Sequence, residues 1–184
     1  MQYGVCSLSI VPVRSEANDR AEMVTQLLYG DVFEIISIQK NWIHIRIAFD
    51  FHEGWIDVKQ FITIEESQFN AIKERPFYCS IDFIEFVNTQ NNQLLPISIG
   101  SCLSALQLLK HQFDGAFVKP TSFLKEKISE IASLYLNAPY QWGGKTPFGI
   151  DCSGFTQMVY RICGFSLLRD ASQQAKQGTA LSFI

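Results

Sequence analysis

The chain has 184 residues, of which 47% are hydrophobic and 18% are charged, and its formal net charge is −3. That length suits one ordinary domain or two to three small ones, and the composition is that of a globular protein. No cluster of lysine and arginine indicates nucleic acid or an anionic membrane as a partner, and the apolar runs are too short to span a bilayer.

Five cysteines, at positions 6, 79, 102, 152 and 163, form no CxxC pair. This pattern favours reduced thiols over a disulfide framework and does not resemble a zinc site, so we expect neither metal nor cofactor. The first residues, MQYGVCSLSIVPVRS, lack a basic leader, a long apolar core and a small-residue cleavage site. We therefore expect a cytoplasmic protein, or one of the cell envelope if the start has been trimmed.

In residues 1–62, apolar and polar residues alternate as they do in short β-strands. In NWIHIRI, Ile43, Ile45 and Ile47 share one face, and in DVFEIISI, Ile36 and Ile38 stand among polar residues. EGWIDVKQF adds a turn and a further strand. Several short strands without a helical period predict a small barrel. The order of these motifs also resembles a bacterial SH3-like domain.

Residues 63–122 predict a second, degenerate SH3-like or β-rich domain. FYCSIDFIEF and QLLPISIGSCL are typical of strands on either side of the turn-rich NTQNNQ, and FDGAFVKP supplies a hairpin-like turn. SCLSALQLLKHQF is also compatible with a short helix. No low-complexity linker separates the segments, so we expect the domains to pack tightly.

From residue 122 the apolar residues follow a helical period. A first helix is predicted in SFLKEKISEIASLYLN, capped by Thr121 or Ser122 and ended by Asn137 and Pro139. Its apolar face would hold Leu124, Ile128, Ile131 and Tyr135. A second helix is predicted from Phe155, Met158, Val159 and Ile162, with Gly164 at its C-terminal cap.

Cys152 falls at or just before the first turn of this second helix. Free N–H groups and a partial positive charge at a helix start stabilise an anion such as a thiolate. The preceding glycines permit a sharp turn and a close approach of substrate. The alternative is a small buried hydrophobe, the usual place of a free cysteine.

The stretch APYQWGGKTPFGIDCSGF resembles the nucleophile segment of the NlpC family of cell-wall cysteine peptidases, which carry P-Y-x-W-G-G followed by D-C-S-G-F. LLRDASQQAKQGTAL resembles the segment that follows that helix, so the resemblance covers about residues 123–184. An SH3-like region ahead of the peptidase is also a family arrangement. The implied fold is α+β, with one or two SH3-like barrels (residues 1–62 and 63–122) and then the helical N-terminal half of a papain-like domain (residues 123–184).

The resemblance implies a γ-D-glutamyl-L-diamino-acid endopeptidase, of the dipeptidyl-peptidase VI type, acting on peptidoglycan stem peptides. Cys152 would attack the γ-glutamyl carbonyl and form an acyl-enzyme. Tyr140 would lie beside the nucleophile and the oxyanion, to which the Cys152 backbone N–H would also donate. Asp151, Ser153 and Asp170 match positions that face the substrate groove.

In relatives with SH3-like domains, acidic groups at one end of the groove hold the free amine of an N-terminal L-alanine. Glu22 is the candidate for such an acid. His52 stands where relatives often carry a tyrosine before EGW, a departure from the family pattern. The alternatives are a solvated surface acid for Glu22 and a loop residue for His52. Trp142, with its two glycines, is expected to be a buried ring next to a tight turn.

Thiol catalysis needs a base, normally a histidine. His44, His52 and His111 all precede Cys152, whereas in the family the catalytic histidine follows the cysteine. We therefore expect a truncated chain that is inactive by itself. A non-catalytic module that binds cell-wall peptides is the alternative. An amidase or acyltransferase is disfavoured, because PYQWGG together with DCSGF belongs to the peptidase branch.

Overall fold

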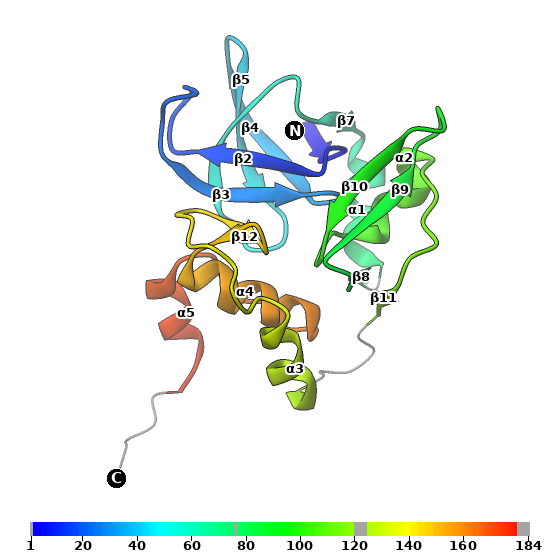
Figure 1. The fold of residues 1–184 in the computed structure, drawn as a ribbon. Coiled ribbons are helices and arrows are strands. Elements are labelled where there is room, and N and C mark those ends of the chain that lie inside the picture. The colour runs from blue at the N-terminus through cyan, green and yellow to red at the C-terminus, as the bar shows by residue number, and fades with distance from the viewer. Residues whose placement is uncertain (1, 76, 120–124, 180–184) are drawn as a thin grey trace.

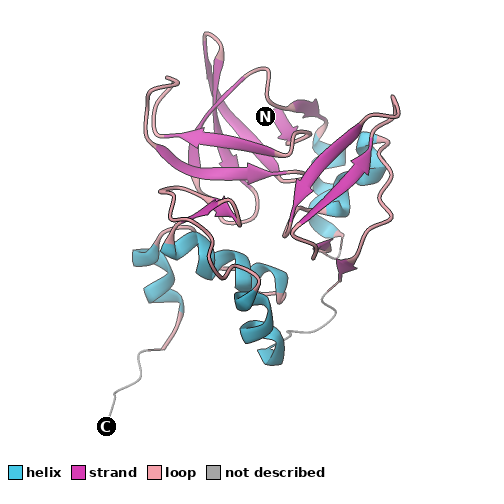
Figure 2. Cartoon of the chain, viewed as in Figure 1, coloured by secondary structure: helices cyan, strands magenta, loops and turns pink. Residues whose placement is uncertain are grey.

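The computed structural model describes residues 2–75, 77–119 and 125–179 (Figure 1). A twisted sheet from the first third of the chain lies above a group of helices from the last third, and a β-hairpin with short helices lies to one side (Figure 2). Within the described residues, no helix is both long enough and apolar enough to cross a bilayer.

Seven strands form an antiparallel sheet in the order β3-β2-β6-β5-β4-β1-β7. They are β1 (Gln2–Val5), β2 (Ile10–Arg14), β3 (Met23–Leu28), β4 (Val32–Gln39), β5 (Trp42–Ile47), β6 (Glu53–Asp57) and β7 (Ile62–Ile64). Ile43, Ile45 and Ile47 of β5 are buried, as their alternation predicted. In the described residues β3 and β7 do not pair with each other, so a closed barrel is not confirmed.

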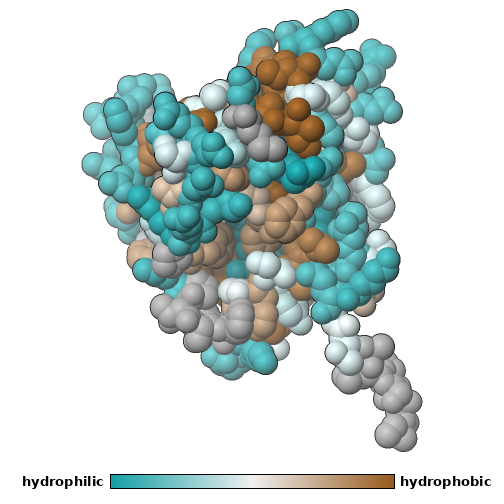
Figure 3. Space-filling view, turned by 180° about the vertical axis from the view of Figure 1, so that it is seen from behind, coloured by the Kyte–Doolittle hydropathy of each residue, from teal (hydrophilic) through white to brown (hydrophobic). Residues whose placement is uncertain are grey.

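Strand β4 departs from simple alternation. The pairing of β4 with β5 shifts register between Ile35 and Ser37, which leaves Ile36 as an extra residue that interrupts the alternation of buried and exposed side chains. Ile35 therefore enters the core, whereas Ile36 and Ile38 are 42% and 60% exposed. On the face opposite to that of Figure 1, hydrophobic side chains gather in a patch near the top, within a largely hydrophilic surface (Figure 3).

The middle of the chain contains small elements rather than one sheet. They are α1 (Glu66–Glu74), β8 (Cys79–Ser80), β9 (Ile84–Asn88), β10 (Leu94–Ser98), the 3₁₀ helix η1 (Leu103–Ala105), α2 (Leu106–Leu109) and β11 (Phe117–Val118). β9 pairs with β10, and β11 pairs with β8 instead of closing a hairpin of its own. Sequence reasoning missed α1, which buries only Phe69 and Ile72 in an otherwise polar stretch.

The last third of the chain is mainly helical. It comprises the 3₁₀ helix η2 (Lys125–Lys127), α3 (Ile128–Ser133), the short strands β12 (Lys145–Thr146) and β13 (Gly149–Ile150), α4 (Cys152–Ile162) and α5 (Ala171–Gln177). The predicted cap residues Thr121 and Ser122, and Leu124, lie outside the described residues. Gly164 has a positive φ of 89° after α4, as its predicted role at the C-terminus requires.

The helical segment shares a core with the sheet. Leu28 at the end of β3 packs in the same cluster as Met158, Val159 and Ile162 of α4 and Ile131 of α3. Burying these side chains holds α4 against the sheet through the apolar area removed from water. The tight packing of segments expected from the sequence is therefore present.

Candidate active site

Cys152 is the first residue of α4, and its side chain is exposed. Asp151 precedes it in an extended conformation and caps the helix, because its Oδ1 accepts a 2.6 Å hydrogen bond from the Gly154 N–H. The other N–H groups at a helix start have no partner within the helix and carry partial positive charge. An anion that forms on or beside the sulfur therefore lies where the helix stabilises it.

A buried ion pair with Arg169 fixes the side chain of Asp151. Arg169 Nη1 lies 3.0 Å from Oδ1 and Nη2 lies 2.7 Å from Oδ2, while the Gly143 N–H donates to Oδ2 at 2.8 Å. Burial opposes ionisation, but hydrogen bonds from Arg169 and from the Gly154 N–H hold the pKa of Asp151 below its usual value. Asp151 thus anchors the start of α4, and its contact with substrate stays a prediction.

Ser153 belongs to the same buried cluster. Its Oγ accepts a 2.8 Å hydrogen bond from Arg169 Nη1 and lies 3.3 Å from Asp151 Oδ1. Its backbone carbonyl accepts from Gln174 Nε2 at 2.9 Å, which ties α5 to the first turn of α4. A substrate contact of the Ser153 side chain remains a prediction.

Tyr140 lies beside the segment that leads into Cys152. The Ile150 N–H donates to the Pro139 carbonyl at 3.0 Å, and the Gln141 N–H donates to the Ile150 carbonyl at 3.1 Å. Tyr140 and Ile150 are therefore bridged in parallel, two residues before the thiol. The Tyr140 side chain is 67% exposed, and its catalytic role stays a prediction.

The loop that contains Trp142 packs on the edge of the sheet. Gly143 has a φ of 75°, and a Cβ there would lie 2.3 Å from the Met23 carbonyl oxygen, so only glycine fits. The expected burial of the Trp142 ring is wrong, because the ring is 61% exposed. Its Nε1 donates to Glu22 Oε1 at 2.5 Å, which places the predicted groove acid beside this loop. Recognition of an amine by Glu22 stays a prediction.

His52 and Asp170 come from distant parts of the chain to the same region. His52 is half-buried, and the charges of Asp50 and Asp170 act on its ring. Burial outweighs those charges and lowers the pKa of His52. Asp170 is exposed just before α5, and its backbone N–H donates to Gln173 Oε1 at 3.2 Å. Substrate contacts of both side chains remain predictions.

A buried polar interface joins the sheet to the helical segment. The hydrogen bonds that cross it link Asp31 to Arg161 (2.5 Å), Asp50 to Gln157 (2.9 Å), Gln26 to the Lys145 N–H (2.7 Å) and Thr25 to Arg169 (2.9 Å). The Lys145 side chain is fully buried here, and burial lowers its pKa to about 8. Directional bonds of this kind fix the position of Glu22 and His52 relative to Cys152.

Within the described residues, no histidine is hydrogen-bonded to Cys152. His44 stacks on Trp55 with 4.9 Å between ring centroids, and His111 Nδ1 lies 2.9 Å from the Tyr29 hydroxyl. No group of three or more His, Cys, Asp or Glu side chains forms a possible metal site in this part of the chain.

Sequence reasoning missed Arg169. It is 1% exposed and joins Asp151 and Ser153 of the helical segment to Thr25 of the sheet. The sequence indicated only that a buried Asp151 would need a cationic partner. Nothing in the local sequence LLRDA, where Arg169 stands between Leu168 and Asp170, identified this arginine as that partner.

Comparison with known proteins agrees with this geometry. Residues 137–182 match the NlpC/P60 family, and residues 13–61 match the bacterial dipeptidyl-peptidase Sh3 domain. The chain is 26% identical to dipeptidyl-peptidase 6 of Lysinibacillus sphaericus over 85% of its own length and 68% of that protein. It is 23% identical to the gamma-D-glutamyl-L-lysine dipeptidyl-peptidase of Bacillus cereus over 87% of its length and 56% of that protein.

A crystal structure of an NlpC/P60 family protein from Bacillus cereus has the same fold. It superposes with a TM-score of 0.76 at 16% identity, over 98% of this chain and 78% of that one. The segment around Cys152 therefore matches an NlpC/P60 domain, and it follows a segment that matches the bacterial dipeptidyl-peptidase Sh3 domain in the same chain.

Proposed function

We propose that this chain provides the nucleophile and the amine-binding end of a peptidase that cleaves the γ-D-glutamyl–diamino acid bond of peptidoglycan stem peptides. The observation that carries the proposal is the exposed Cys152 at the start of α4, with its capping Asp151 fixed by Arg169. The relatives named for dipeptidyl-peptidase and γ-D-glutamyl-L-lysine dipeptidyl-peptidase activity support the reaction class.

In the proposed reaction, the Cys152 sulfur attacks the γ-glutamyl carbonyl carbon. Negative charge passes to the carbonyl oxygen, which the Cys152 backbone N–H and Tyr140 stabilise. The C–N bond then breaks, the amine of the diamino acid leaves with a proton, and water hydrolyses the thioester. Asp151 and Arg169 do not exchange protons in these steps. They keep the first turn of α4, and hence the sulfur and the N–H, in place.

The peptide end of the substrate is proposed to lie between the loop of Trp142 and the sheet. Glu22 reaches this loop, and Asp170 and His52 lie near each other on the two sides of the interface. A carboxylate at the peptide end of the site favours an ammonium group there. The proposed substrate is therefore a stem peptide with a free N-terminal L-alanine, already released from its sugar.

Glu22→Gln tests the amine-binding role. We expect kcat/KM for L-Ala-γ-D-Glu-diamino acid peptides to fall by about 10–150-fold, because a hydrogen bond to a charged group is worth about 1.5–3 kcal/mol. The N-acetylated peptide should be affected little. Glu16→Gln, which replaces another exposed acid of the sheet domain, is the matched control. Equal losses on free and acetylated peptides would rule out this role for Glu22.

The 184 residues alone should be labelled at Cys152 but should turn over substrate far more slowly than a protein that also supplies a base. Iodoacetamide should modify Cys152 in the native chain, because the other four cysteines are buried. Turnover should be lower by about 10²–10⁴-fold than in a protein that supplies a base, since positioned proton transfer contributes that much. Peptide mapping and product analysis measure the two effects.

Turnover that disappears on His52→Ala would instead identify His52 as the base. Turnover that survives both His52→Ala and His44→Ala would contradict the need for a histidine.

A further inference from the structure

Cys79 and Cys102 face each other across two antiparallel segments. The Ser80 N–H donates to the Ser101 carbonyl at 3.2 Å, and the Leu103 N–H donates to the Tyr78 carbonyl at 3.0 Å. These bonds flank the Cys79–Cys102 bridge on both sides, so the two cysteines form a non-hydrogen-bonded pair. In such a pair the Cα atoms are about 4.5 Å apart and the side chains point to the same face.

That spacing lies within the range that a disulfide spans, with Cα atoms about 4.4–6.8 Å apart. Both side chains are reduced in this structure, and they are 0% and 7% exposed. The third buried thiol nearby, Cys163, follows α4 and is not paired with either cysteine as a strand neighbour. The backbone register therefore singles out one pair among the five cysteines.

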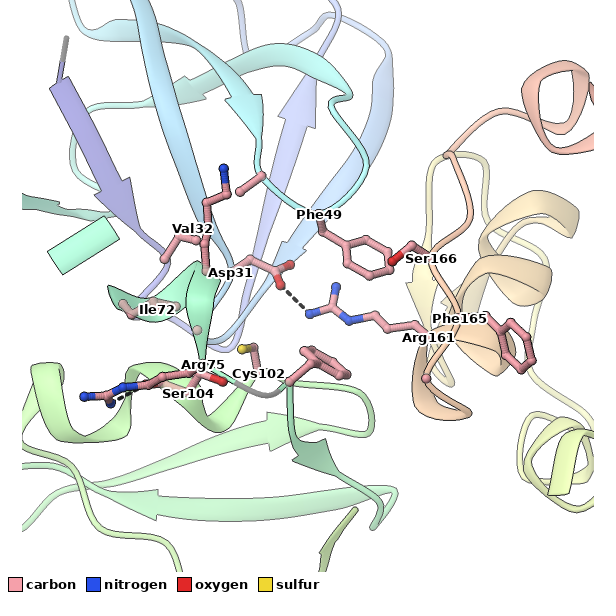
Figure 4. A pocket seen from close by; sticks show the side chains of 15 residues that line it. Asp31, Val32, Phe49, Ile72, Arg75, Cys102, Ser104, Arg161, Phe165 and Ser166 are labelled. Atoms are coloured by element: carbon pink, nitrogen blue, oxygen red, sulfur yellow. Dashed lines mark hydrogen bonds and ion pairs between the residues drawn. The ribbon is translucent and has the colours of Figure 1, made fainter. Parts of the chain in front are cut away.

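A cavity of ≈ 290 Å³ reaches Cys102 of this pair. Its wall includes Cys102, Arg161 and Asp31, together with the exposed side chains of Lys73 and Arg75 at its outer part. Figure 4 shows the Cys102 side chain close to the Asp31–Arg161 ion pair. A small oxidant can therefore reach Cys102 from solvent, whereas Cys79 lies behind it in the core with Leu28 and Met158.

We propose that Cys79 and Cys102 are a modification site, at which a peroxide forms a reversible cross-strand disulfide. The Cys102 thiolate attacks one peroxide oxygen, the O–O bond breaks, and the departing oxygen leaves as water after taking up a proton. The Cys79 sulfur then attacks the sulfur of the resulting sulfenic acid and displaces a second water. Two thiols and hydrogen peroxide thus give one disulfide and two waters.

The bond would join two parts of the middle segment that contact different neighbours. The Cys102 N–H donates to the Tyr29 carbonyl at 2.8 Å, and a Cβ on Gly30 would lie 1.8 Å from the Cys102 carbonyl oxygen, so this segment sits directly on the turn between β3 and β4. Cys79, in β8, packs in the core shared with α4. Oxidation would therefore link the part of the middle segment that lies on the sheet to the part that packs against α4.

Both thiols react slowly in the reduced protein. Burial raises the pKa of Cys79 to about 12 and also raises the pKa of Cys102, although the Arg161 charge lowers both. The exposed Cys152 would react first with a peroxide. The pair is therefore tested in a Cys152→Ser background.

The experiment treats Cys152→Ser protein with hydrogen peroxide in one arm and refolds it from denaturant in a thiol–disulfide redox buffer in the other. Free thiols are then blocked in denaturant, and the digested protein is mapped by mass spectrometry. We expect a linked pair of peptides containing Cys79 and Cys102, two fewer free thiols, and a Tm higher by roughly 5–10 °C that dithiothreitol reverses.

Additional substitutions identify the pair. Adding Cys79→Ser or Cys102→Ser should abolish the link and the rise in Tm, whereas adding Cys163→Ser, a matched buried cysteine, should leave both unchanged. The proposal is overturned if neither arm yields the Cys79–Cys102 peptide, or if the linked peptides contain Cys163 or Cys6 in place of one partner.

Discussion

In a protein that contains these 184 residues together with a catalytic base, replacing Cys152 by alanine should reduce the rate of peptide hydrolysis by about 10⁴-fold or more. The sulfur is the proposed nucleophile, and no other described side chain at the start of α4 can form the thioester. Because Cys152 is exposed, its loss should leave the Tm almost unchanged.

Cys152→Ser is the second variant for this test. It keeps the size and polarity of the side chain but replaces the thiol by a much weaker nucleophile at neutral pH. We expect it to be as inactive as the alanine variant, as measured by release of the free diamino acid. Alanine-variant turnover within tenfold of wild type would show that Cys152 is not the nucleophile.

Arg169→Ala should destabilise the fold and loosen the site together. The substitution leaves the buried Asp151 carboxylate without its cation and removes the bond to Thr25. Breaking a buried ion pair on one side typically costs about 3–5 kcal/mol. The Arg169→Lys variant should recover only part of this, because an ammonium group cannot reproduce the two-pronged contact with Asp151. Arg46→Ala, which breaks an exposed ion pair with Glu53, should cost at most about 1 kcal/mol.

Denaturant unfolding and its pH dependence measure this effect. The folded-state pKa of Asp151 is lowered, so the pair stabilises the protein above the unfolded-state pKa and this contribution is lost as pH falls through the folded-state pKa. Arg169→Ala should remove that acid dependence, whereas a purely local packing defect would leave it. Wild-type stability with unchanged kcat in Arg169→Ala would contradict the positioning role.

Local patterns were sufficient to predict the elements that carry the nucleophile. The period of Phe155, Met158 and Ile162 predicted α4, and the alternation in NWIHIRI predicted β5 with its buried isoleucines. These features depend on residues within a few positions of one another, where helix and strand periodicity acts. The motif around Cys152 similarly placed the thiol at a helix start.

Features that depend on distant residues could not be predicted. Arg169 lies 18 residues from Asp151 and 144 from Thr25, so no local pattern links them. Trp142 looked like a core ring, but the loop that carries it packs on Met23 and turns the ring toward Glu22. The exposure of Ile36 and Ile38 results from a strand register shift that alternation alone does not reveal.

The most direct test of Cys152 as the peptidase nucleophile is a search for its thioester. L-Ala-γ-D-Glu-L-Lys would be mixed with the base-containing protein, quenched in acid within milliseconds to seconds, and the protein digested for mass spectrometry. We predict an L-Ala-γ-D-glutamyl group on the peptide that contains Cys152, together with release of free lysine. Consumption of the tripeptide with that peptide unmodified and the acyl group on another residue, or with free alanine as the product, would contradict the proposal.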